Sequence, residues 1–94
     1  MWLKAVMISR EALTRLENDL RSKGIAEPLI EKSKKFAENI HFRLSNFFFS
    51  EVPEDKRHIY AKLLEDNCIL MARNWALGLS GKLTYKDVSN FLEK

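Results

Sequence analysis

An aromatic ring stands among cations and amides in the stretch IHFRLSNFFFS, which begins at Ile40. At about 100° per residue on a helix, Ile40, Leu44 and Phe47 share one face. Phe42 then points almost directly away from them, with basic and amide side chains on either side. An outward ring beside cations suits non-covalent recognition, because the ring supplies contact area and the cations attract acidic groups.

Two kinds of partner fit this pattern. A protein partner would use aromatic and arginine anchors, which dominate binding hot spots; the residues predicted to bind it are Phe42, Arg43, Asn46 and Phe49. A DNA or RNA strand would stack a base on the ring and place its phosphates on cations. The residues predicted to bind nucleic acid are Lys32, Lys35, Asn39, Phe42 and Arg43. A third interpretation is that Phe42 packs under another helix, or against a second subunit, beneath lysine stems.

The placement of charge favours the protein partner. The net charge is +3, and residues 1–47 carry nine basic and six acidic side chains, whereas residues 48–94 carry seven of each. Residues 32–46 alone hold an excess of three positive charges. So small an excess suits the steering of an acidic partner better than nonspecific nucleic-acid binding, whose affinity grows with the number of phosphates neutralised.

Catalytic and metal-binding patterns are missing from the sequence. The two histidines, His41 and His58, stand apart, and Cys68 is the one cysteine, whereas a structural zinc site needs several such ligands. The residues SGK at 80–82 lack the remainder of a phosphate-binding loop. We therefore expect no enzyme, no metal, no cofactor and no small-molecule substrate.

Two asparagines, Asn67 and Asn74, lie seven residues apart between apolar stripes of one helix. A buried amide without a partner costs about 1–3 kcal/mol. We favour the interpretation that both amides lie in the core, bond neighbouring backbone or each other's helices, and fix the register of the helices. The alternatives are a self-association seam and a ligand pocket.

The length and composition of the chain indicate one small globular domain. The chain has 94 residues, of which 46% are hydrophobic and 31% are charged, and a chain of this length builds a single core. We expect one helical domain over residues 1–94. A lone cysteine indicates a reducing compartment and hence the cytoplasm. The apolar start MWLKAVMI is too short for a signal-peptide core, and no apolar run reaches the length of about 20 residues that crosses a membrane.

Apolar spacing predicts two long helices in the first half of the chain. Steps of four and three run from Trp2 to Leu20, and Gly24 supplies a stop. We expect this helix to begin near residue 2; the alternative is a start at Ser9 as N-cap. A second helix is predicted from Pro28 to about residue 50, with a stripe on Ile30, Ser33, Ala37, Ile40, Leu44 and Phe47.

The sequence of the second half of the chain predicts a long central helix and a short C-terminal helix. Residues 54–77 carry two apolar stripes, so this helix should contact two neighbours. The first stripe is Ile59, Leu63, Leu70 and Leu77; the second is Tyr60, Leu64, Cys68, Met71 and Trp75; the expected solvent face is His58, Lys62, Glu65, Asp66 and Arg73. Thr84 and Asp87 are spaced as a capping pair for a last helix. The predicted fold is therefore all-α: a small bundle of three long antiparallel helices plus a short C-terminal helix.

Overall fold

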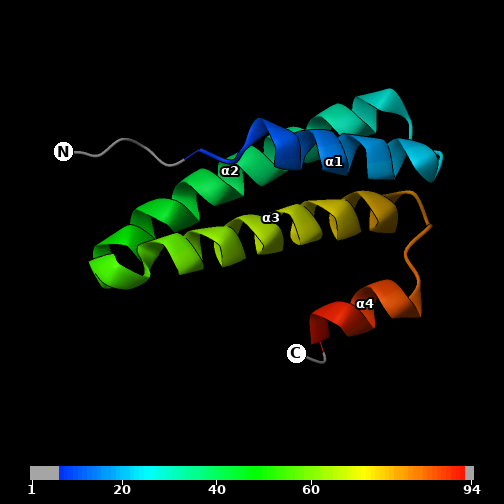
Figure 1. Ribbon diagram of the computed structural model, residues 1–94. Helices are drawn as coiled ribbons and strands as arrows, with labels where there is room; N and C mark the ends of the chain where they lie inside the picture. The colour runs from blue at the N-terminus through cyan, green and yellow to red at the C-terminus, as the bar shows by residue number, and fades with distance from the viewer. Residues whose placement is uncertain (1–6, 93–94) are drawn as a thin grey trace.

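The computed structural model describes residues 7–92, except for the side chains of residues 48, 49 and 90–92. Its elements are α1 (Arg10–Ser22), α2 (Glu27–Glu51), the 3-10 turn η1 (Glu54–Lys56), α3 (Arg57–Leu79) and α4 (Tyr85–Leu92). The described residues contain no strand, which confirms the all-α prediction. The helices α2 and α3 form a long antiparallel hairpin, and α1 and α4 lie on opposite sides of α3 in the view of Figure 1. Within these residues, no helix is both long and apolar enough to cross a bilayer.

The first helix starts later than predicted. Ser9 has an extended backbone, with φ −72° and ψ 150°, and its Oγ accepts a hydrogen bond from the Ala12 N–H at 3.1 Å. The Ser9 N–H donates to Glu65 Oε2 at 2.7 Å. The predicted start near residue 2 is therefore wrong for residues 7–9, because a cap and a contact from α3 hold Ser9 outside the helix. Trp2 and Val6, which began the predicted stripe, lie outside the described residues.

The α1–α2 turn follows the predicted stop. Gly24 has a φ of 78°, a left-handed conformation that favours glycine. The Ile25 N–H donates to the Leu20 carbonyl and the Gly24 N–H to the Arg21 carbonyl, which is the pairing of a Schellman motif. Pro28 lies in the first turn of α2, as expected, where a missing N–H leaves no intrahelical bond unmade.

Small side chains form the contact between α2 and α3. The buried residues of α2 recur every four positions from residue 33, as Ser33, Ala37, His41 and Ser45, and those of α3 as Leu64, Cys68, Ala72 and Ala76. Such every-fourth rows form the ridges that interdigitate in helix packing. The Ser33 Oγ donates to the Ala72 carbonyl at 3.0 Å. The predicted stripe of α2 is only partly buried at its end, because the row turns towards His41 and Ser45 and leaves Phe47 62% exposed.

The central helix α3 contacts both α1 and α2, as its two stripes predicted. It begins at Arg57, after η1, rather than at residue 54. The second stripe is buried at Leu64 and Cys68, whereas Ile59 and Leu63 of the first stripe are half exposed. The physical reason is length: α1 has 13 residues against 23 in α3, so it covers only part of that helix.

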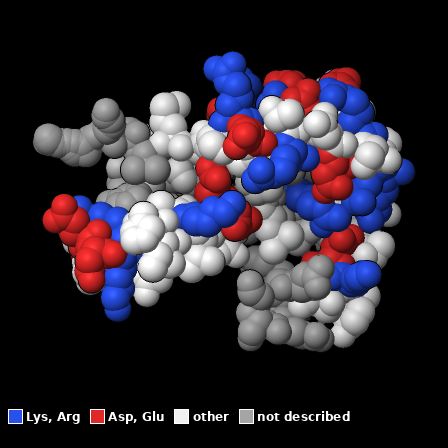
Figure 2. All heavy atoms as spheres, in the orientation of Figure 1, with Lys and Arg blue, Asp and Glu red and all other residues white. Residues whose placement is uncertain are grey.

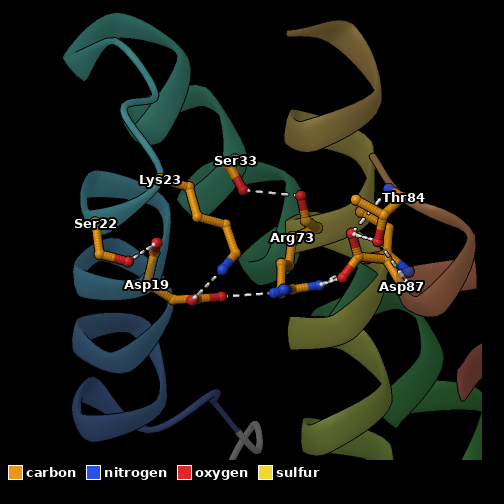
Figure 3. A network of polar contacts seen from close by, with 9 residues as sticks. Asp19, Ser22, Lys23, Ser33, Arg73, Thr84 and Asp87 are labelled. Carbon is orange, nitrogen blue, oxygen red and sulfur yellow. Dashed lines mark hydrogen bonds and ion pairs between the residues drawn. The ribbon is translucent and has the colours of Figure 1, made fainter. Parts of the chain in front are cut away.

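A charged network joins α1, α3 and α4 (Figure 3). Arg73 Nε donates to Asp19 Oδ2 at 2.5 Å, and Arg73 Nη1 donates to Asp87 Oδ1 at 3.0 Å. Arg73 and Glu65 were predicted to face solvent; that is wrong, because each is half-buried and engaged by another part of the chain. A carboxylate or guanidinium is readily buried in part once it is paired.

The capping pair that opens α4 is confirmed. The Thr84 N–H donates to Asp87 Oδ2 at 3.0 Å, and the Asp87 N–H donates to Thr84 Oγ1 at 3.3 Å. These bonds satisfy backbone donors that the first turn of a helix leaves free. The Thr84 N–H, with the Thr84 hydroxyl and Arg73, lowers the pKa of Asp87 to about 2.

The cap at Ser9 predicts a stability change. Ser9→Ala should lower the free energy of unfolding by about 1 kcal/mol, because the Ala12 N–H loses its acceptor. Urea titration followed by circular dichroism measures this change. The matched control is Ser22→Ala, since that hydroxyl donates to the Asp19 carbonyl at the exposed end of the same helix. Equal stability of Ser9→Ala and wild type would contradict the start at Arg10.

The charged network at Arg73 predicts a larger loss of stability than the cap at Ser9 does. Arg73→Met should lower the free energy of unfolding by about 1–3 kcal/mol, because two carboxylates lose a half-buried partner. Lys62→Met is the control; it breaks an exposed pair with Asp66 at 3.2 Å, which is expected to contribute less than about 1 kcal/mol. The two variants are compared by urea unfolding at one pH and salt concentration. A loss no greater in Arg73→Met than in Lys62→Met would show that the network does not stabilise the fold.

Candidate functional site

The outer face of α2 is the surface formed by Lys32, Lys35, Asn39, Phe42, Arg43 and Asn46. All six side chains are exposed, and Phe42 is 50% exposed. Their positions span about 100° of the helix circumference, so one partner can contact them together. Phe49 was predicted to belong to this face; its backbone lies in α2, but its side chain is outside the described part of the structure.

The cations of the outer face differ from the neighbouring Lys34 in whether they form ion pairs. Lys34 is paired: its Nζ lies 3.3 Å from Glu17 of α1 and 3.4 Å from Glu31, one turn earlier on α2. Among the described residues, no carboxylate lies within 4.0 Å of the charged nitrogens of Lys32, Lys35 or Arg43. Three cations of the outer face therefore remain available to an acidic partner.

A groove of about 440 Å³ adjoins Phe42. One wall comes from the segment that precedes α1 and the other from α2, and these run close together in Figure 1. Its lining residues are Met7, Ile8, Lys35, Glu38, Asn39, His41 and Phe42. The groove therefore combines apolar walls with two opposite charges, an amide and an imidazole.

His41 is the functional candidate that the sequence prediction missed. It is 2% exposed, and no described group forms a hydrogen bond with its imidazole. Burial lowers its pKa, while the charge of Glu65 on α3 acts in the opposite direction. Two signals in the sequence pointed to it: the spacing of Glu38 and His41 as ExxH, and the every-fourth row from Ser33 through Ala37.

The two asparagines differ in their surroundings. Asn67 is exposed, and its Nδ2 donates to the Leu63 carbonyl of its own helix at 2.8 Å. The expected core position is therefore wrong for Asn67, whereas its expected bond to neighbouring backbone is present. Asn74 is half-buried and accepts a hydrogen bond from Arg73 Nη1 at 3.2 Å. It also lines a hollow of about 310 Å³ with Met71, Trp75 and Val88.

A second exposed apolar surface lies on the first half of α3. Ile59, Tyr60 and Leu63 are 52%, 41% and 50% exposed. Figure 2 shows uncharged atoms over much of the hairpin between its acidic tip and the body of the bundle. Because α1 is too short to cover this half of α3, these side chains remain accessible.

Reactive groups do not converge in the described part of the chain. No three side chains among its His, Cys, Asp and Glu residues lie close enough to hold a metal ion. Burial raises the pKa of the Cys68 thiol to about 11, so it stays protonated and weakly nucleophilic at neutral pH. We assign no reaction to the outer face of α2.

Comparison with known proteins gave no match: no family model, curated protein or solved structure matches this chain. The function must therefore be inferred from its own residues.

The buried imidazole predicts a pH-dependent stability. The folded pKa of His41 lies below its ordinary value of 6.5, so the folded state binds fewer protons than the unfolded state. The contribution of the neutral His41 to the free energy of unfolding is complete above pH 6.5 and is lost as the pH falls toward the folded pKa. The free energy of unfolding changes over this range by at most about 1.4 kcal/mol per pH unit. Glu65, whose charge acts on His41, and Glu38, which lines the same groove, are kept in every variant that is compared.

Urea unfolding at pH 7.5 and pH 5.5 checks this expectation. The loss of stability between the two values should be smaller in His41→Leu than in wild type. His58→Leu, at an exposed position of α3, should keep the wild-type loss. An identical loss in wild type and His41→Leu would show that His41 is not held neutral by burial.

Proposed function

We propose that this protein is a non-enzymatic helical interaction module that binds an acidic protein partner through the outer face of α2. The single observation that carries the proposal is the half-exposed Phe42 ring, which lies among cations that form no ion pair with described residues. The cations would steer the partner, and the ring would anchor it. Phe49 is included in the proposed contact because it follows Phe42 by two helical turns.

A homo-oligomer is the other form of the proposed interaction module, and its contact would lie on α3, because a second copy carries the same net positive charge. The exposed Ile59 and Leu63 continue toward Asn67 along α3, and an asparagine within an apolar helix seam favours one register over others. This observation supports the self-association seam. Light scattering of the purified protein distinguishes a homo-oligomer from an adaptor for another protein.

Nucleic acid is the alternative partner for the same face. Asn39 and Asn46 lie exposed beside Phe42, and amide edges hydrogen-bond to bases. The excess of three positive charges over residues 32–46 is small for phosphate binding, whose affinity grows with the number of phosphates neutralised, so the protein partner is preferred.

The test compares wild type with the double variant Phe42→Ala, Arg43→Ala. Immobilised wild type captures the partner from its native cells, and calorimetry then measures the affinity of the isolated complex. Loss of an aromatic and an arginine anchor should weaken binding at least about 30-fold, which corresponds to a change of about 2 kcal/mol. The control is Leu79→Ala, Lys86→Ala, which removes an exposed apolar side chain at the end of α3 and an exposed cation on α4.

Two outcomes would overturn the protein-partner proposal. One is unchanged affinity in the Phe42, Arg43 variant. The other is a captured nucleic acid whose affinity falls steeply, on logarithmic scales, between about 50 and 200 mM salt. A protein contact anchored by aromatic side chains should change little over that range.

A further inference from the structure

The floor of the groove beside Phe42 has an unmet hydrogen-bonding requirement. A neutral imidazole has one N–H donor and one nitrogen acceptor. Neither is paired with a described residue in His41, although the side chain is 2% exposed. A buried polar group left without a partner costs about 1–3 kcal/mol, so a group that enters the groove and pairs with it gains binding energy.

Several polar side chains on α3 and on the buried row of α2 already have partners within the chain. Glu65, the acidic residue of α3 whose charge reaches His41, accepts the Ser9 N–H at 2.7 Å. Ser45 is one turn along α2 and donates to the Phe42 carbonyl at 3.0 Å, while Ser33 donates to Ala72 across the helix contact. His41 is among the residues that line the groove, so its imidazole is a polar group of the lining that has no described partner.

The walls of the groove define the shape of the group that fits it. Met7, Ile8 and Phe42 are apolar, and Lys35 and Asn39 lie at the same groove on the outer face of α2. A side chain with an apolar body and a polar tip matches apolar walls above a polar floor. Tyrosine and tryptophan are the side chains of this kind.

We propose that the groove binds one aromatic side chain of the partner, a tryptophan or tyrosine, whose N–H or O–H donates to the imidazole of His41. Its ring packs against Phe42 and the wall formed by Met7 and Ile8, and an acidic neighbour in the partner segment pairs with Lys35. This inference rests on the proposed function, since it specifies which partner residue the outer face of α2 recognises.

The probes are two acetylated, amidated tripeptides, Asp-Trp-Asp and Asp-Phe-Asp, titrated into the wild-type protein at pH 7.5. Both carry the same charge and an aromatic ring, but only the tryptophan has a hydrogen-bond donor. NMR follows the ring resonances of His41, with His58 as the internal reference. One hydrogen bond of about 1 kcal/mol predicts that the tryptophan peptide binds about 5-fold more tightly.

The variant His41→Leu should bind the two peptides equally, and Asp-Tyr-Asp should behave as Asp-Trp-Asp does with wild type. The wild-type comparison decides the matter even if His41→Leu fails to fold. Equal affinity of the tryptophan and phenylalanine peptides, or no binding of either, would overturn the inference and leave water as the partner of His41. The proposed function fails separately, by unchanged capture in the Phe42, Arg43 variant.

Discussion

The close contact between α2 and α3 is the constraint on which the remainder of the molecule depends. Serine, alanine and cysteine occupy much of this contact, and the Ser33 hydroxyl reaches the Ala72 carbonyl across it. Small side chains let two helix backbones approach closely, but they bury little apolar area each. Larger residues therefore flank the contact, as in the stacked rings of Phe36 and Trp75, whose centroids are 4.9 Å apart. The hairpin fixed in this way gives α2 a buried side and, opposite it, the outer face that carries Phe42.

Much of the fold followed from local sequence signals. Apolar spacing gave the three long helices, Gly24 and Pro28 marked the first turn, and the Thr84–Asp87 pair marked the start of α4. Each signal depends on residues a few positions apart, whose geometry is fixed by the helix itself. The exposure of Phe42 followed from the same geometry.

The features that were missed depend on contacts between distant parts of the chain. Ser9 fitted both a helical stripe and a cap, and its bond to Glu65, 56 residues away, distinguishes the two. Arg73 seemed a surface charge because its partners, Asp19 and Asp87, belong to other helices. Local spacing relates His41 to Glu38, but its groove exists only because the segment at Met7 and Ile8 runs beside α2. No local pattern contains these distances.

The guanidinium of Arg73 also has a consequence for motion. It pairs with one carboxylate from the first helix and one from the last, so the N-terminal and C-terminal elements share one cation despite their separation in sequence. A competing anion that drew this side chain away would remove a charged contact from both elements at once, while the buried Leu16 and Leu20 would still hold α1 against the bundle. A change in the pairing of one residue of the central helix thus alters contacts of two elements that are far apart in the chain.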